Sequence, residues 1–160
     1  MNLPARLFLP ADPAATERLG EQLGERLRPG DAVALVGEMG AGKTTLVRGL
    51  ARGLRVLDAA AVQSPTYLLV LEYEGPVRLL HADAYLPQKL AGFLADGGLE
   101  YLFDPTAVAV VEWAEHIREH LPRRTLWVEL ALAPSGGRQV TLRSDQANGF
   151  PWVAELSKMA

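Results

Sequence analysis

The segment GEMGAGKT at residues 37–44 constrains the fold more than any other part of the chain. It matches G-x-x-x-x-G-K-[ST], in which glycines let the backbone wrap around phosphates and point its N–H groups at their oxygens. A buried strand should precede such a loop, and a helix whose N-terminus favours anions should follow it. Ala32–Val36 is a short continuous apolar run, and a helix is expected from Lys43 to about Leu54. The sequence therefore predicts a phosphate-binding loop between a central strand and a helix.

A first helix is predicted near the N-terminus. Asp12 is a suitable N-cap, Pro13 fits the first helical position, and Pro29-Gly30 should end the helix. Leucines recur at every fourth position and should form its buried face: Leu19, Leu23 and Leu27.

The remaining patterns predict a mixed sheet. Strands are expected at 66–73, 77–82, 107–111, 125–132 and 139–143, with a short closing helix near 150–158. The Gly and Pro residues between the first two of these indicate an antiparallel hairpin, and 87–103 reads as helix broken by Gly97-Gly98. Together the elements predict an α/β fold, a three-layer P-loop NTPase-like domain with parallel strands plus an antiparallel hairpin. We expect all of residues 1–160 to form this one domain.

Composition argues against several classes of function. The net charge is −3, whereas a protein that mainly grips nucleic acid usually carries a basic surplus. The absence of cysteine excludes disulfides, thiolate metal sites and cysteine nucleophiles. The N-terminal residues do not resemble a signal peptide, and no apolar run approaches the ~20 residues that cross a bilayer. We expect a cytoplasmic protein without membrane contact or direct DNA binding.

ATP with Mg²⁺ is the ligand that the loop favours. Lys43 would place its charge over the β- and γ-phosphates, and the Thr44 hydroxyl could ligate Mg²⁺. GTPases read guanine with an Asn/Thr-Lys-x-Asp motif, and none of the three lysines, Lys43, Lys89 and Lys158, lies in one. ATP is therefore favoured over GTP.

Two acidic residues end predicted strands. Glu112 follows the apolar run 107–111, at the edge of the sheet where ligands bind, and would hold Mg²⁺ or position water as a Walker B acid. The alternative is a solvated strand-end glutamate. A period of two puts His81, Asp83 and Tyr85 on one face, which indicates the edge of a site. A turn aspartate beside a structural histidine and tyrosine is the alternative there.

Thr66 is a candidate switch residue. It follows Ser64-Pro65, and the proline fixes an extended approach from which the threonine could reach the γ-phosphate or the metal. A simple turn at the start of a strand explains the same spacing equally well.

The motifs together resemble those of the TsaE (YjeE) family, the ATPase of bacterial tRNA threonylcarbamoyladenosine biosynthesis. The resemblance covers most of the chain and rests on Thr16, GEMGAGKTT at 37–45, VQSPTY at 62–67, HADAY at 81–85, GLE at 98–100, VEW at 111–113 and Gly137-Arg138. Many NTPases share the first of these loops, whereas the ordered set of SPTY, HxDxY and VEW is specific. One residue departs from the family, which usually has arginine at the position of Leu86. Arg48, Arg78 and Arg138 are candidates to replace its charge.

The resemblance implies roles for the matched residues. The nucleotide would be bound by Gly37, Glu38, Met39, Gly40, Ala41, Gly42, Lys43, Thr44 and Thr45, with Thr16, Arg138 and Trp113 at its borders. Thr44 and Glu112 would hold Mg²⁺, and Glu112 would also polarise the attacking water. Asp83 would support this metal or water shell, and Thr66 would act as the switch contact. For Trp113, a core aromatic is an equally good interpretation.

The resemblance also implies a task. The family works with the proteins TsaD and TsaB, which modify adenosine 37 of tRNAs that read codons beginning with A. Hydrolysis of ATP to ADP is expected to reset or activate that complex, and tRNA would be contacted only through it. Turnover should be slow alone and faster with the partners, because no arginine finger is identifiable.

Two other functions fit the loop. A small-molecule kinase would need an acceptor pocket and usually an arginine-rich lid, but 87–103 contains no arginine. A non-hydrolysing nucleotide switch would not need a carboxylate at the position of Glu112.

Overall fold

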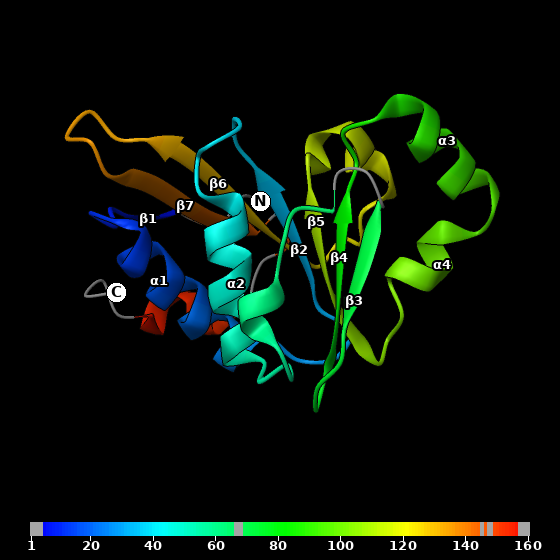
Figure 1. Cartoon of the computed structure of the whole chain (residues 1–160), viewed down its shortest axis with the longest axis horizontal. Helices are drawn as coiled ribbons and strands as arrows, with labels where there is room; N and C mark the ends of the chain where they lie inside the picture. The colour runs from blue at the N-terminus through cyan, green and yellow to red at the C-terminus, as the bar shows by residue number, and fades with distance from the viewer. Residues whose placement is uncertain (1–4, 66–68, 145, 147–148, 157–160) are drawn as a thin grey trace.

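The computed structural model describes residues 5–65, 69–144, 146 and 149–156. Its strands are β1 (Arg6–Phe8), β2 (Ala32–Val36), β3 (Val70–Tyr73), β4 (Arg78–Asp83), β5 (Ala107–Glu112), β6 (Thr125–Leu132) and β7 (Arg138–Ser144). They form a seven-stranded sheet in the order β1-β7-β6-β2-β5-β4-β3 (Figure 1). The strands β6, β2, β5 and β4 are parallel to their neighbours in this run, so their carboxyl ends meet at one edge. The outer pairs β3–β4, β6–β7 and β1–β7 are antiparallel.

Helices cover both faces of the sheet. The α-helices are α1 (Pro13–Arg26), α2 (Lys43–Gly53), α3 (Pro87–Ala95) and α4 (Gly98–Leu102), and the 3₁₀ helices are η1 (Ala59–Ala61), η2 (Ala114–His120) and η3 (Pro151–Glu155). One core cluster joins α1 and α2 to the sheet, and a second joins α4 and η2 to the opposite face. Figure 1 shows α3 and α4 beyond the β3 end of the sheet. The predicted α/β fold with a mixed sheet and a β3–β4 hairpin is confirmed.

Glycines allow α1 and α2 to approach each other closely. Each helix contributes two glycines whose added Cβ atoms would meet backbone atoms of the other helix: Gly20, Gly24, Gly49 and Gly53. The predicted leucines of α1 are buried on the same side: Leu19, Leu23 and Leu27. The two helices therefore pack with their backbones nearly in contact, which fixes the position of α2 at the end of β2.

Replacing Gly49 by alanine should destabilise the fold. The new Cβ would lie 2.0 Å from the backbone oxygen of Glu17, so the two helices would have to move apart. Overpacking of this kind typically costs about 1–3 kcal/mol, and urea unfolding would measure it. Gly92→Ala in α3 is the matched control, since its Cβ would meet nothing within 4 Å. Helix propensity should make that variant about as stable as the wild type or up to ~1 kcal/mol more stable. Equal loss in both variants would contradict the close-packing argument.

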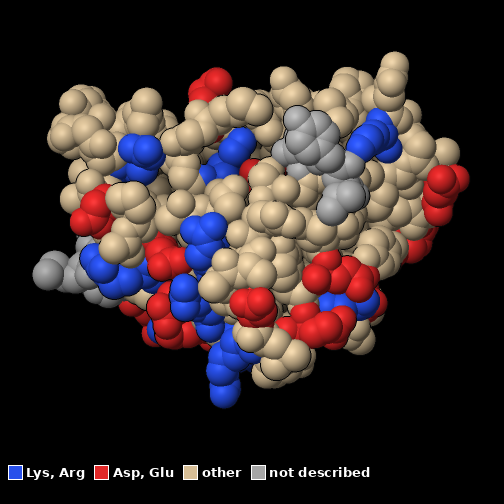
Figure 2. Space-filling model, viewed as in Figure 1, with Lys and Arg blue, Asp and Glu red and all other residues tan. Residues whose placement is uncertain are grey.

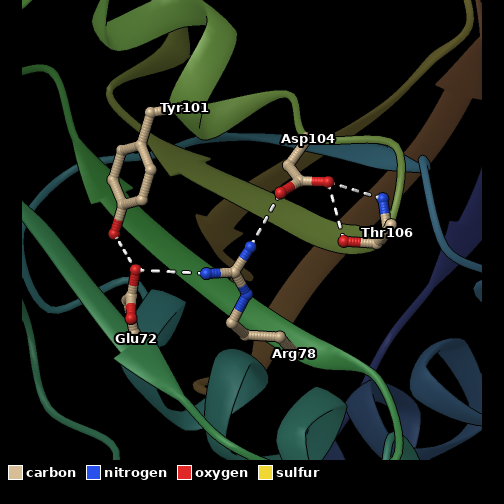
Figure 3. A network of polar contacts seen from close by, with 5 residues as sticks. All are labelled: Glu72, Arg78, Tyr101, Asp104 and Thr106. Carbon is tan, nitrogen blue, oxygen red and sulfur yellow. Dashed lines mark hydrogen bonds and ion pairs between the residues drawn. The ribbon is translucent and has the colours of Figure 1, made fainter.

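A polar network ties α4 to the edge of the sheet (Figure 3). The Arg78 guanidinium contacts Glu72 at 3.4 Å and Asp104 at 2.8 Å. The Tyr101 hydroxyl donates to Glu72, and Asp104 accepts hydrogen bonds from the backbone and side chain of Thr106. Burial, followed by the hydrogen bond to Glu72, raises the pKa of Tyr101 from 10.0 to about 12. The hydrogen bonds from Thr106, with the nearby Arg78 charge, lower the pKa of Asp104.

The raised pKa of Tyr101 gives a pH prediction. The folded state favours the protonated phenol, so this contribution to stability is complete below pH 10.0 and is lost as pH rises toward about 12. A tyrosinate absorbance titration should show one late step in the wild type that Tyr101→Phe removes. Glu72→Gln should move that step back toward 10.0, because it removes the acceptor's charge. A Tyr101→Phe variant that loses only a step near 10.0, while folded by circular dichroism, would contradict this assignment.

The helices and strands differ from the expected ones in three respects. The short strand β1 was not predicted, and it pairs with β7. Within the described part of the predicted strand 66–73, the strand starts at Val70 and leaves out Leu69, which has a φ of 64° and donates its N–H to the Pro65 carbonyl at 2.8 Å; residues 66–68 lie outside the described part of the chain. The closing helix is a 3₁₀ turn at Pro151–Glu155. None of the helices in the described part of the chain has the length and apolar character needed to span a bilayer.

Candidate nucleotide-binding site

The glycine-rich loop, residues 37–42, connects β2 to α2 as predicted. Gly40 and Gly42 have φ values of 79° and 103°, a region that residues with a Cβ rarely adopt. Gly42 is the N-cap of α2 and supplies no side-chain hydrogen bond to the first turn. The N–H groups at the start of α2 therefore lack a side-chain cap, and an anion such as phosphate would satisfy them.

A cavity of about 310 Å³ opens at this helix end. Its walls come from the loop, α2, and the carboxyl ends of β4 and β5, which are neighbours in the sheet. It is lined by Met39, Gly40, Gly42, Lys43, Thr44, Thr45, Ser64, Asp83, Glu112, Trp113 and Arg138. The structure thus brings both predicted acids to the predicted loop. Gly37, Glu38 and Ala41 belong to the loop but do not line this cavity.

The two acids reach the cavity because they share one face of the sheet. On β4 and β5, the alternate residues Leu79, Val108 and Val110 pack in the core cluster beneath α1 and α2. Asp83 and Glu112 continue this period of two at the strand ends and are paired in register. Both are nearly buried, with 2% and 3% of their surface exposed. The alternative of a solvated strand-end glutamate at 112 is therefore wrong.

The Asp83 carboxylate also shapes the turn that leaves β4. Its Oδ1 accepts a hydrogen bond from the Tyr85 backbone N–H at 2.8 Å. Tyr85 itself lies beyond the strand and is 40% exposed. The expected single face of His81, Asp83 and Tyr85 therefore holds for the first two residues only, because the strand ends at Asp83.

Lys43 lies between the loop and an aromatic ring. Its Nζ donates to the Gly37 carbonyl at 2.6 Å and lies 4.0 Å from the centroid of the Trp113 ring. Trp113 has a φ of 57° and also contacts the Tyr85 ring, with the centroids 4.8 Å apart. Trp113 lines the cavity and also packs, partly buried, against the second core cluster, so both interpretations of this residue hold in part. A cation over an indole face is stabilised electrostatically, so this contact holds the ammonium at the cavity.

A second, smaller cavity lies beside the first. It has a volume of about 140 Å³ and is lined by Ala11, Asp12, Pro13, Thr16, Gly42, Thr45, Gly136, Gly137 and Arg138. Arg138 lines both cavities, and its Nη2 donates to the Gly40 carbonyl at 3.1 Å. Thr16 is buried at the start of α1 and lines the smaller cavity but not the larger one. The two cavities together offer a phosphate end and a second compartment for the rest of a ligand.

Arg48, Arg78 and Arg138 were candidates to replace the arginine that the family usually has at the position of Leu86, and the structure distinguishes among them. Arg138 is at the cavity, whereas the Arg48 Nη2 donates to the Val62 carbonyl at 3.2 Å. Arg78 lies at the amino end of β4, in the network of Figure 3 and away from Asp83. Leu86 is the N-cap residue of α3 and is half-buried. Thr66, the predicted switch residue, lies outside the described residues.

The donor set fits a hard cation that arrives with a nucleotide. Within the described residues, no group of three or more His, Asp or Glu side chains could hold a metal ion. The cavity does bring together the Thr44 hydroxyl and the carboxylates of Asp83 and Glu112. Mg²⁺ prefers oxygen ligands and is usually bound by one or two carboxylates together with substrate phosphates. This site therefore fits Mg²⁺ bound to ATP better than Mg²⁺ alone.

Sequence reasoning missed two features of the site. Ser64 lines the cavity, although only its neighbour Thr66 was singled out. His81, expected at the edge of the site, is fully buried behind it and contacts Glu112, with 2.6 Å between Nε2 and Oε2. The HADAY pattern indicated that His81 belongs near the site. Its contact with Glu112 depends on the register between β4 and β5, which are far apart in the sequence.

Comparison with known proteins identifies the family. A family model described as "Threonylcarbamoyl adenosine biosynthesis protein TsaE" matches residues 10–140. The chain belongs to the TsaE family. The matched residues of this TsaE-family chain include the glycine-rich loop, both acids and Arg138.

Individual relatives agree with this assignment. Similar proteins named "tRNA threonylcarbamoyladenosine biosynthesis protein TsaE" include one from Treponema pallidum, 36% identical over 127 residues that make up 79% of this chain and 92% of that protein. A second, from Bacillus subtilis, is 34% identical over 131 residues, 81% of this chain and 80% of that one. The crystal structure of Bacillus subtilis YdiB matches with a TM-score of 0.76 at 28% identity, over 97% of this chain and 94% of that one. The TsaE-family fold therefore extends over nearly the whole chain.

Proposed function

We propose that the protein is the ATP-binding and ATP-hydrolysing subunit of the machinery that makes N6-threonylcarbamoyladenosine in tRNA. One observation carries the proposal: in a TsaE-family chain, the glycine-rich loop, Lys43 and two buried carboxylates line one cavity. A nucleotide triphosphate has the charge and shape for such a loop, and a strand-end carboxylate is suited to activate water beside it. The proposal places the protein in the cytoplasm, where ATP and tRNA are found.

Each part of the cavity has a proposed task. The free N–H groups at the start of α2 and the Lys43 ammonium hold the β- and γ-phosphates, and Lys43 offsets charge that develops on the γ-phosphoryl group. Glu112 orients the attacking water and accepts its proton, while Asp83 supports the same shell. Mg²⁺ bound with the nucleotide would be held by Thr44 and Glu112 and would supply further charge stabilisation. Thr16 and Arg138, in the smaller cavity, border the nucleoside end.

Trp113 takes part in loading the site under this proposal. Its ring faces the Lys43 ammonium, so an arriving phosphate competes with the ring and with the Gly37 carbonyl for that cation. A phosphate is the stronger partner, because it is an anion and adds charge–charge attraction to the hydrogen bond from the ammonium, whereas the carbonyl and the ring are neutral.

We further propose that hydrolysis resets or activates a complex of TsaD and TsaB, and that tRNA is reached only through that complex. The charge distribution supports this division of tasks. The chain has 16 Lys and Arg against 19 Asp and Glu. On the face shown in Figure 2, the basic side chains of the described residues that gather between the centre and the lower edge are bordered by acidic ones on both sides, so they form no broad basic surface. A direct tRNA-binding role would need such a surface.

Phosphate release measured with and without TsaD and TsaB tests the proposal. We expect slow release of ADP and phosphate by the protein alone and a clear increase when both partners are added. Release that is equal in the two conditions would refute activation by the partners. ATP binding without any phosphate release, even in the full complex, would instead favour a non-hydrolysing switch. Phosphorylation of a small-molecule acceptor would favour a kinase.

A further inference from the structure

The histidine on β4 lies directly behind the acidic group of the site. The side chain of His81 has no exposed surface, and its Nε2 is 2.6 Å from Oε2 of Glu112 on the neighbouring strand. In the parallel register, His81 is opposite Val110, so its side chain reaches Glu112 along the shared face of the two strands. Glu112 lines the cavity, whereas His81 does not. The histidine can therefore affect a ligand in this cavity through the carboxylate that it contacts.

The second ring nitrogen defines how this pair is bonded. Nδ1 of His81 is buried and has no hydrogen-bond partner among the residues that the structure describes. A neutral imidazole has one donor and one acceptor nitrogen, and a buried N–H without an acceptor is rarer than a buried lone pair without a donor. The tautomer with the proton on Nε2 therefore fits the structure, with that N–H donating to the Glu112 carboxylate.

A carboxylate on the last residue of a strand would otherwise have several rotamers. Glu112 ends β5, and Trp113, the next residue, has a positive φ that turns the chain away. A short hydrogen bond from a fully buried donor selects one orientation for the carboxylate. Partners behind a ligating or proton-accepting group commonly change metal affinity or activity by 10–100-fold.

We propose that His81 is a positioning residue, which holds the Glu112 carboxylate in the orientation that faces the loop and Lys43. This inference rests on the proposed function of Glu112. It gives a task to His81, the first residue of the HADAY motif. His81 itself does not line the cavity.

Two substitutions separate positioning from packing. His81→Leu removes the donor and keeps an apolar core, whereas the side-chain amide of His81→Gln can donate from nearly the same place as Nε2. We expect His81→Leu to lower single-turnover hydrolysis about 10–100-fold and to weaken Mn²⁺ binding in the presence of ADP about tenfold. Binding of ADP without metal should stay within about twofold, and His81→Gln should recover most of both losses. A role in packing alone would not produce rescue by glutamine. Hydrolysis and Mn²⁺ binding at wild-type levels in folded His81→Leu would overturn the proposal.

A double-mutant cycle sharpens the test. If His81 acts through the carboxylate, His81→Leu should cause little further loss when Glu112 is already glutamine. Independent, multiplying losses would contradict the proposal.

Nitrogen-15 NMR of the wild-type imidazole provides a readout that needs neither hydrolysis nor a folded variant. We expect the proton of His81 on Nε2, and a proton on Nδ1 would overturn the proposal. If the wild type never hydrolyses ATP, the proposed function fails, yet the tautomer and the Mn²⁺ affinities still decide whether His81 orients Glu112.

Discussion

Replacing Lys43 by alanine should weaken ATP binding by more than about a hundredfold, which corresponds to about 3 kcal/mol. Lys43 lines the cavity, and its ammonium donates a hydrogen bond to the carbonyl of Gly37 at the start of the loop. An ammonium that leaves this carbonyl and the Trp113 ring can bond two phosphate groups, and hydrogen bonds with charged partners contribute about 1.5–3 kcal/mol each. Alanine removes these bonds without adding bulk to the loop. Isothermal titration calorimetry with ATP and Mg²⁺ measures the change.

Lys89→Ala provides the matched control for this experiment. Lys89 is an exposed residue of α3 and does not line the cavity, so the substitution removes the same charge elsewhere. We expect its ATP affinity to stay within about twofold of the wild type, because an exposed lysine outside the cavity makes no direct bond to the nucleotide and its charge is screened by salt. Similar losses in both variants would show that net charge, rather than the Lys43 position, governs binding. Undiminished binding by folded Lys43→Ala would remove the basis of the proposed function.

Local patterns were sufficient to predict the half of the fold that holds the site. The strand Ala32–Val36 agrees residue for residue, and α2 begins at Lys43 as the loop motif requires. These elements depend on interactions between residues near in sequence, such as an apolar run and a glycine-rich turn. The strand β1 was beyond such reasoning, because three residues carry no clear period and its pairing with β7 joins opposite ends of the chain.

In the site, too, local patterns predicted which residues are involved, whereas contacts between distant segments could not be predicted. Glu112 and Asp83 could be predicted to lie at the carboxyl edge, since each ends an apolar strand. Their pairing, and the contact between His81 and Glu112, depend on how β4 and β5 align, which sequence spacing does not encode. The sequence also gives no local sign of the positive φ of Trp113, whose ring lies over Lys43. Bulky residues such as tryptophan rarely adopt that conformation.

Glu112→Gln should stop hydrolysis while sparing nucleotide binding. Glutamine has nearly the same volume, and its amide oxygen can still accept the hydrogen bond from Nε2 of His81. It cannot accept a proton from water, and loss of a general base typically slows a reaction about 10²–10⁴-fold. We therefore expect single-turnover hydrolysis to fall at least about a hundredfold, with the affinity for ATP without metal within about threefold of the wild type.

Glu115→Gln is the matched control for Glu112→Gln, because Glu115 is exposed on η2 only a few residues away. It should hydrolyse ATP at the wild-type rate, both alone and with TsaD and TsaB. The combination of outcomes separates the two halves of the site. Lys43→Ala weakens binding and with it every later step, whereas Glu112→Gln leaves a loaded protein whose hydrolysis is slowed. A folded Glu112→Gln variant that hydrolyses ATP normally would assign the proton acceptor to another group, with Asp83 the first to test because it faces the same cavity.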